Sequence, residues 1–139
     1  MKQIITGLIL LFSLLLTISC TSRESVVQQI IGKWKMEKVI EQSEDVTQNH
    51  NPRNDRWISF YEQSGIDIGG TFESGSGDKT ENSGKWFYYE KENELYLDSD
   101  AGEADDSYWA ITIKNDSMHW KGRRFEFNKR FEIFHSRIK

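Results

Sequence analysis

The 139-residue chain contains little cysteine, little proline and, outside its first nineteen residues, little leucine. A single cysteine excludes a disulfide scaffold within the chain. Six of the eight leucines fall in residues 1–19, so the other 120 residues hold only Leu95 and Leu97. Those 120 residues contain 17 aromatic side chains, which favour strands, and they lack the leucines typical of a helix bundle.

An excess of basic charge is also absent. The formal net charge of the whole chain is −4. Residues 20–139 carry 17 of the 18 Lys and Arg residues and all 22 Asp and Glu residues. This balance excludes a strongly basic nucleic-acid-binding protein. The hydrophobic content of 37% is an average over two different pieces, because 12 of the first nineteen residues are apolar.

Residues 1–19 have the pattern of a secretory signal peptide. Lys2 gives a positively charged start, and an uncharged, mostly apolar run over residues 4–18 follows. Fifteen helical residues cover about 22 Å, which is short of the ~30 Å hydrocarbon core of a bilayer. We therefore expect this segment to direct export and not to remain as a membrane span.

The apolar run ends at Thr17–Cys20, which resembles the lipobox of bacterial lipoproteins. Ser19 and Cys20 match the usual pattern, Ile18 is acceptable, and Thr17 stands where leucine is usual. The resemblance implies that Cys20 becomes the first residue of the mature protein and carries acyl chains, which would anchor it to a membrane of the bacterial cell envelope, at the outer membrane or cell surface. An ordinary cleaved signal with a nearby cysteine is the alternative.

Residues 20–29 are interpreted as a lipidated tether and residues 30–139 as one folded domain. Apolar spacing over 26–31 indicates one helical turn. From residue 32 onward, alternating aromatic and β-branched residues predict eight strands. Long polar segments at 42–56 and 74–83 are expected to be a loop and a flexible connection. The predicted strands cover residues 32–38, 57–61, 69–73, 84–90, 94–98, 107–114, 118–121 and 125–138.

Short turns between these strands favour antiparallel pairing, because parallel strands need long crossovers. A meander of eight strands has exposed edges unless it closes on itself. We therefore predict an all-β fold, a small eight-stranded antiparallel up-and-down barrel, and expect it to be monomeric.

The triplet Gly32-Lys33-Trp34 at the head of the first strand resembles the Gly-x-Trp opening of the lipocalins. Residues 30–139 as a whole resemble the lipocalin-like domains of small bacterial exported lipoproteins. The resemblance implies that Trp34 closes one end of the barrel and that an arginine from the last strand lies across its ring. Arg130 is the first candidate, and Arg124 and Arg137 are alternatives that the sequence does not separate.

No residue pattern typical of catalysis is present. His50, His119 and His135 lie far apart in the sequence, and we expect each at the surface or the rim. The acidic segment 98–106 partly resembles a calcium loop, with Asp98 and Asp100 as weak candidate ligands, but a solvated acidic turn is favoured. We expect no enzyme activity, no cofactor and no metal site.

Binding by burial is the function that these patterns favour. A lipocalin-like barrel is expected to enclose a small apolar or amphipathic molecule. The alternative is a filled barrel that acts as an interaction or scaffold lipoprotein, through exposed aromatic residues and the acidic loop. The side chains expected to line the ligand site are Trp86, Tyr88, Leu95, Leu97, Trp109 and Phe127.

Overall fold

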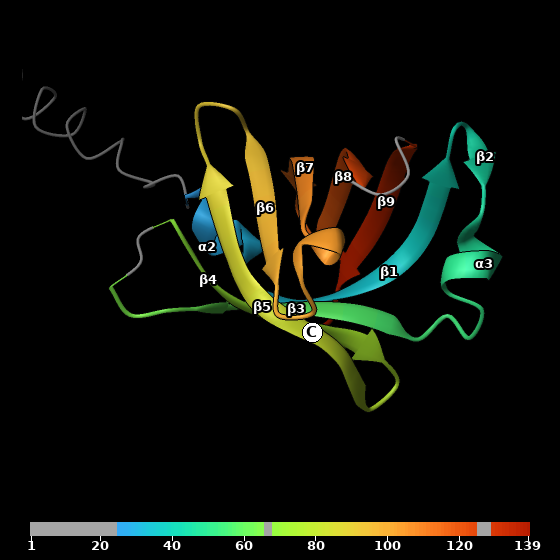
Figure 1. Cartoon of the computed structure of the whole chain (residues 1–139), viewed down its shortest axis with the longest axis horizontal. Coiled ribbons are helices and arrows are strands. Elements are labelled where there is room, and N and C mark those ends of the chain that lie inside the picture. Colours follow the sequence, from blue (N-terminus) through green and yellow to red (C-terminus); the bar gives the residue numbers. More distant parts are fainter. Residues whose placement is uncertain (1–24, 66–67, 125–128) are drawn as a thin grey trace, which may run out of the picture.

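Strand β1 and strands β3 to β9 close into an antiparallel barrel (Figure 1). The computed structural model describes residues 25–65, 68–124 and 129–139. The predicted fold class, an all-β eight-stranded antiparallel up-and-down barrel, is confirmed. In chain order the elements are α2 (Val26–Ile30), β1 (Gly32–Glu41), β2 (Glu44–Asp45), α3 (Thr47–His50), β3 (Arg56–Glu62), β4 (Gly69–Ser76), β5 (Lys79–Tyr89), β6 (Glu94–Ser99), the 3₁₀ helix η1 (Glu103–Asp105), β7 (Ser107–Lys114), β8 (Ser117–Arg124) and β9 (Arg130–Arg137).

Strand β1 closes the barrel because it pairs on both sides. Its first residues, Gly32 to Lys35, pair with β3, and the stretch from Trp34 to Glu41 pairs with β9. The register with β9 shifts between Met36 and Lys38, which marks a β-bulge in β1. The two-residue strand β2 pairs with the end of β1, outside the barrel.

The segment expected to be a flexible connection, 74–83, is instead a hairpin. Strand β4 continues to Ser76 and β5 already begins at Lys79. The turn uses Gly77 at φ +55°, and a Cβ on Gly75 would lie 1.9 Å from the carbonyl oxygen of Lys79. The glycines therefore permit a tight turn and close strand approach, although their composition looks like that of a linker.

The long polar segment 42–56 is attached to the barrel through the side chain of Asn51. Asn51 is 3% exposed, and its Nδ2 donates to the carbonyl oxygen of Met36 at 2.8 Å. Its Oδ1 accepts from the backbone N–H groups of Asp55 and Arg56 at 3.0 and 3.1 Å. One buried amide thus satisfies three backbone groups and fixes the entry into β3.

The barrel has a closed end covered by α2 and an open end beside α3 and η1. Figure 1 places α2 and α3 near opposite ends of β1. The half next to α2 is filled by large side chains that are at most 1% exposed, including Trp34, Phe60, Trp86, Leu95 and Met118. Phe60 and Trp86 meet edge to face, with ring centroids 5.5 Å apart.

The predicted signal peptide (residues 1–19) and the first half of the predicted tether, residues 20–24 with Cys20, lie outside the described residues. Val26–Ile30 forms the predicted helical turn, capped by the Ser25 hydroxyl, which accepts from the Gln28 N–H. Among the described residues, no helix is both long enough and apolar enough to cross a membrane.

Candidate functional site

Trp34 closes the barrel at the end covered by α2. Its Nε1 donates to the carbonyl oxygen of Ile30 at 2.8 Å, and the guanidinium of Arg137 lies 4.2 Å from the ring centroid. Gly32 has φ +125°, and a Cβ there would lie 2.8 Å from Arg137 Nη1. The glycine before this tryptophan therefore leaves room for the arginine that covers the ring.

Arg137, and not the first candidate Arg130, occupies this position, so the assignment of Arg130 is wrong. Trp34 stands opposite Arg137 in the β1–β9 register, whereas Arg130 begins β9, seven residues or about 23 Å away, and is exposed. The two Arg137 Nη atoms donate to the carbonyl oxygens of Ile31 and Gln29 at 2.8 and 2.6 Å. The side chain of Arg124, the other alternative, lies outside the described residues.

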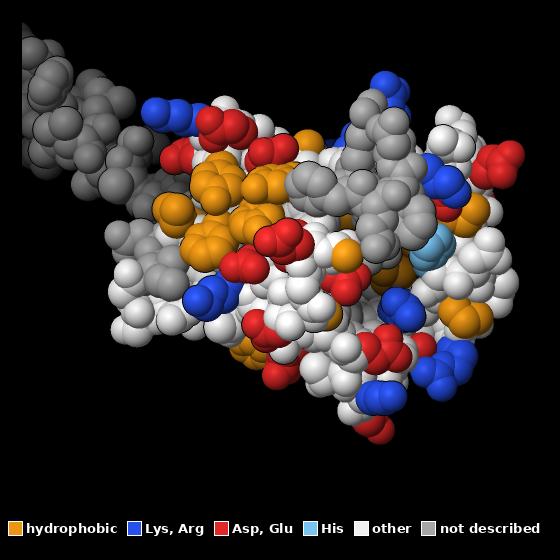
Figure 2. Space-filling model, in the orientation of Figure 1, with side chains coloured by type: hydrophobic (Ala, Val, Ile, Leu, Met, Phe, Trp, Pro, Cys, Tyr) orange, Lys and Arg blue, Asp and Glu red, His pale blue; other side chains and the backbone are white. Residues whose placement is uncertain are grey.

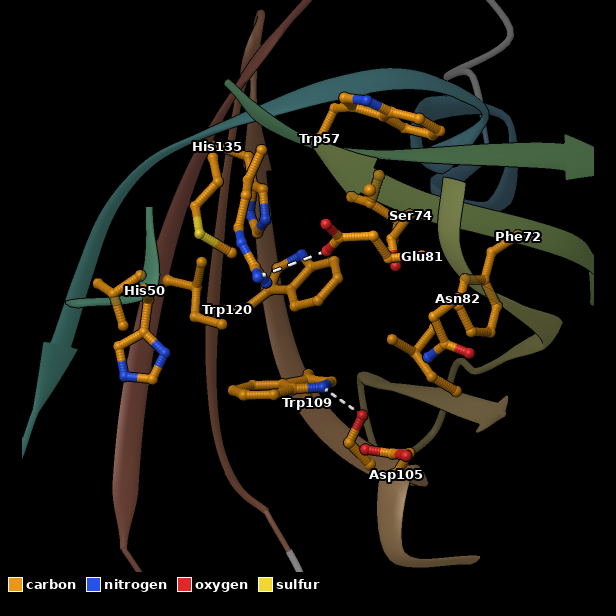
Figure 3. A pocket seen from close by; sticks show the side chains of 18 of the residues that line it. His50, Trp57, Phe72, Ser74, Glu81, Asn82, Asp105, Trp109, Trp120 and His135 are labelled. Carbon is orange, nitrogen blue, oxygen red and sulfur yellow. Dashed lines mark hydrogen bonds and ion pairs between the residues drawn. The ribbon is translucent and has the colours of Figure 1, made fainter. Parts of the chain in front are cut away.

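The open half of the barrel contains a cavity of about 350 Å³. Figure 3 shows Trp109, Trp120, Glu81 and Asn82 around this space. Ala101 and Asp105, from the β6–β7 connection, line it at the open end. A volume of this size lies near the lower limit for small-molecule sites, about 300–1,000 Å³. The apolar lining residues are Met36, Val39, Trp57, Ile58, Phe72, Leu97, Ala101, Trp109, Trp120, Phe131 and Ile133.

Two of the residues predicted to line a ligand site, Leu97 and Trp109, line this cavity. The other described members of the predicted set, Trp86, Tyr88 and Leu95, are buried in the barrel but are not among the cavity-lining residues. Their strand positions lie toward the closed end, where large side chains fill the interior. Phe127 lies outside the described residues.

A chain of polar contacts lies along one side of the cavity rim. Arg53 donates to the Ser76 hydroxyl at 3.1 Å, and this hydroxyl donates to Glu81 at 2.7 Å. Arg56 lies 3.4 Å from the other oxygen of Glu81. The Ser76 hydrogen bond and, more weakly, the charge of Arg56 lower the pKa of Glu81, although desolvation opposes them. Glu81 is thus linked to Arg56 directly and to Arg53 through the Ser76 hydroxyl.

His135 is buried, so the expectation that it lies at the surface or rim is wrong. It is 4% exposed, lines the cavity, and packs on Trp120 with ring centroids 4.5 Å apart. Burial lowers the pKa of His135 from 6.5 to about 3, against the effect of a hydrogen bond with the Met118 backbone. The sequence signal that could have found this is the alternation along β9, because Phe131, Ile133 and His135 are two residues apart and so face the same side of the strand.

The other two histidines lie nearer the surface. His119 faces outward, 2.9 Å from Glu132, and stacks on Phe134 with ring centroids 4.2 Å apart. His50, in α3, lines the cavity at the open end, with Phe131 edge to face at 5.8 Å.

The outer face of β5, β6 and β7 carries a row of aromatic side chains, which we call the outer aromatic row: Phe87, Tyr89, Tyr96 and Tyr108. The rings of Tyr96 and Tyr108 are stacked at 4.4 Å, and those of Phe87 and Tyr96 at 6.3 Å. Figure 2 shows hydrophobic side chains gathered on this face beside acidic ones. Desolvation, followed by the hydrogen bond to Asp106, raises the pKa of Tyr96 to about 12.

The acidic segment 98–106 connects β6 to β7 through η1. Asp100 accepts from the Ser83 hydroxyl at 2.8 Å, and Asp106 accepts from the Ser99 N–H and the Tyr96 hydroxyl. Asp98, the other weak calcium candidate, is exposed near the end of β6. In the described ranges no three His, Cys, Asp or Glu side chains are grouped so that they could hold a metal ion.

Compared with known proteins, the chain matches no protein-family model and no curated protein.

Proposed function

We propose that this protein is an exported lipoprotein, anchored through Cys20, whose barrel binds a small amphipathic molecule without catalysis. One observation carries the binding role: the open half of the barrel encloses a cavity of about 350 Å³ with a largely aromatic and aliphatic wall. Burial of apolar ligand surface contributes roughly 25 cal/mol per Å², so such a wall binds by the hydrophobic effect alone.

The distribution of polarity along the barrel supports an amphipathic ligand. The rim contains the paired charges of Arg56 and Glu81, whereas the wall beneath it contains Phe72, Leu97 and Phe131. An apolar body inside the barrel and a polar end near the rim would complement both regions. A permanently charged group deep in the cavity would lose hydration without gaining a counter-charge.

A second function is favoured by the outer aromatic row. Exposed, stacked aromatic side chains on a sheet face are typical of protein interaction surfaces. Tyr89 and Tyr108 are 38% and 37% exposed. This feature supports an interaction or scaffold role of the anchored barrel. The filled-barrel form of that alternative, however, requires a filled interior, and only the half of the barrel next to α2 is filled.

The binding proposal is tested with N-phenyl-1-naphthylamine, an apolar dye that fluoresces when buried. We expect saturable binding with one site per chain. Ser74 lines the cavity, so Ser74→Phe should weaken dye binding at least about tenfold by filling it. The matched control is Thr71→Phe, which places the same ring on the outer side of the same strand and should leave binding unchanged. Non-saturable binding, or equal binding by both variants, would refute the proposal.

The natural ligand is best sought by native mass spectrometry of the protein isolated from the membranes of its own host. A reproducible additional mass that is absent from Ser74→Phe supports binding in the cavity.

The anchor is tested by Cys20→Ser. Mass spectrometry of the membrane fraction should find an acylated peptide beginning at Cys20 in the wild type. If the Cys20→Ser protein remains equally membrane-bound, the lipoprotein proposal fails.

A further inference from the structure

The outer aromatic row borders a groove on the outside of the barrel, with a volume of about 420 Å³. Tyr96 and Tyr108 line this groove from the sheet, and Glu103, Ala104 and Asp106 line it from the β6–β7 connection. Tyr108 is 37% exposed, and the side chains of Glu103 and Ala104 are exposed as well. A partner in solution therefore reaches the groove directly, without any movement of the barrel.

Cross-strand pairing builds the aromatic side of the groove. Phe87 stands opposite Tyr96 in the β5–β6 register, and Tyr96 stands opposite Tyr108 in the β6–β7 register. Neighbouring ring planes are inclined by only 21° and 18°, so the three rings form one stacked series. Adjacent strands lie about 4.8 Å apart, so a series over three strands is about 10 Å long. It presents an apolar, electron-rich surface next to the groove.

Negative charge surrounds this aromatic surface. Glu94 and Asp98 lie on β6, two residues before and after its tyrosine, so they share the outer face with it. In the described ranges neither these two carboxylates nor those of Glu103 and Asp106 lie within ion-pair distance of a Lys, Arg or His. Lys85 stands opposite Asp98 in the β5–β6 register, and the surface stays net acidic. Charge complementarity thus favours a cationic partner.

The carboxylate of Asp106 is held in a fixed orientation beside the rings. Its Oδ1 accepts from the Ser99 N–H at 2.8 Å, and its Oδ2 accepts from the Tyr96 hydroxyl at 3.1 Å. Each carboxylate oxygen has two lone pairs, so each oxygen retains one for a further donor. Asp106 is therefore oriented to accept two parallel hydrogen bonds from one flat donor group.

A guanidinium group has the shape and charge that these features complement. It is flat and weakly hydrated, it stacks on aromatic rings, and two of its N–H groups pair with one carboxylate. An ammonium group is a compact, strongly hydrated charge without a flat face. The combination of tyrosine rings with an oriented carboxylate thus favours arginine over lysine.

We propose that the outer aromatic row and the groove beside it are the docking site for an arginine-bearing segment of a partner protein. The guanidinium lies against the tyrosine rings and pairs with Asp106 and Glu103, while apolar neighbours of the arginine cover Phe87. This inference rests on the interaction role proposed above and adds the chemistry of the partner. The β6–β7 connection separates this groove from the cavity, because its Ala101 and Asp105 line the cavity instead.

The test begins with a selection of random heptapeptides, displayed on phage, by the full-length protein in lipid nanodiscs. The selected peptides should be rich in arginine next to apolar residues. A selected peptide with a fluorescein label should bind at least about tenfold more tightly than its analogue with citrulline, the neutral isostere of arginine, because the cation–π contact and the charge-assisted hydrogen bonds are lost. Replacement of arginine by lysine should weaken binding about threefold or more. The readout is fluorescence anisotropy.

Variants of the protein locate the site. Tyr108→Thr removes a ring of the row, and Glu103→Gln combined with Asp106→Asn removes two charges while the side-chain shapes are kept. Each change should weaken binding of the arginine peptide at least about fivefold. If the double variant does not fold, Glu103→Lys reverses one exposed charge and serves the same comparison. The matched controls are Tyr61→Thr, an exposed tyrosine on the outside of β3, and Glu44→Gln on β2, and both should leave the affinity unchanged.

Selected peptides without an excess of arginine, or equal affinity for the arginine and citrulline peptides, would overturn the arginine proposal. If those peptides still lose affinity in Tyr108→Thr, the broader interaction role stands. If no peptide binds in a way that depends on Tyr108, both the arginine proposal and the interaction role fail. Saturable binding of the neutral saccharide cellohexaose that Tyr108→Thr abolishes, without peptide binding, would assign the row to a saccharide and also overturn the proposal.

The role of the cavity is tested separately by Ser74→Phe. This variant should lose N-phenyl-1-naphthylamine binding and keep its affinity for the arginine peptide, because Ser74 lines the cavity and not the groove. Loss of peptide affinity in folded Ser74→Phe would place the peptide in the cavity and overturn the proposed docking site.

Discussion

Lowering the pH from 7 to 5 should destabilise the barrel through His135. The folded state keeps this imidazole neutral down to a pKa of about 3, whereas the unfolded chain takes up a proton near the ordinary value of 6.5. Between these two values the unfolded state binds more protons than the folded state, so the free energy of unfolding falls as the pH falls. The stabilising contribution is fully present above pH 6.5 and is lost toward pH 3.

The magnitude follows from the separation of the two pKa values. One pH unit inside this window corresponds to about 1.4 kcal/mol. Most of the step from pH 7 to pH 5 lies below 6.5, so His135 alone should lower the free energy of unfolding by about 2 kcal/mol. This is a large share of the 5–15 kcal/mol typical of a small domain.

The titration of carboxylates contributes little to the change in stability between pH 7 and pH 5. Asp45 and Glu81 have pKa values lowered from 3.8 and 4.5, by hydrogen bonds from Thr47 and Ser76 respectively as the largest causes. Their contribution has the same sign, because stability is lost as they take up protons, but it is lost mainly below pH 5. A fall in stability between pH 7 and 5 therefore reports on histidine.

The assay is urea unfolding followed by tryptophan fluorescence at half-unit steps from pH 7 to pH 5. His135→Gln should flatten the dependence, whatever its absolute stability, while a His50→Gln control should retain it. A wild-type change below about 0.5 kcal/mol over the two units would refute the reasoning, as would an equally steep dependence in His135→Gln.

Three further predictions concern the framework, each measured by urea unfolding at pH 7. Arg137→Ala should lower the free energy of unfolding by about 2–3 kcal/mol, because it removes a cation–π contact and two charge-assisted hydrogen bonds. The control Arg130→Ala should change the free energy of unfolding by no more than about 0.5 kcal/mol. Equal losses in the two variants would contradict the assignment of Arg137. Gly32→Ala should lower the free energy of unfolding by about 1–3 kcal/mol, since it introduces a Cβ at positive φ and against Arg137. An unchanged free energy of unfolding would mean that the guanidinium moves aside freely. Asn51→Ala should lower the free energy of unfolding by about 2–3 kcal/mol, because three backbone groups lose the partner that the buried amide provides. A loss under about 0.5 kcal/mol would show that water replaces the amide.

Much of the barrel was predictable because alternation of aromatic and β-branched residues is a direct consequence of strand geometry. The strand Ser107–Lys114 has the predicted bounds. The hairpin over 74–83 was missed because serine and glycine are as typical of linkers as of tight turns, and only the facing strand decides between them. The arginine over Trp34 was left open because the choice among three depends on the β1–β9 register, which is a long-range property.

The site was less predictable than the fold. Sequence parity indicates which residues face inward, and Trp86, Tyr88 and Leu95 do so. It does not indicate where along the axis the interior is filled and where it is hollow. That division depends on the joint volume of side chains from eight strands, and so the cavity wall included Leu97 and Trp109 but not the other three described residues.

The position of α2 at the closed end has a consequence for the direction in which the molecule faces. Only four residues separate Cys20 from Ser25, and the five Cα–Cα steps between them span about 17 Å when fully extended. If Cys20 is anchored in lipid as proposed, so short a tether would hold the closed end of the barrel toward the bilayer. The C-terminal Lys139, paired with Asp116, lies at the same end. The open end would then be turned away from the lipid surface. A ligand would then enter and leave the cavity through the surrounding water and not directly from the membrane.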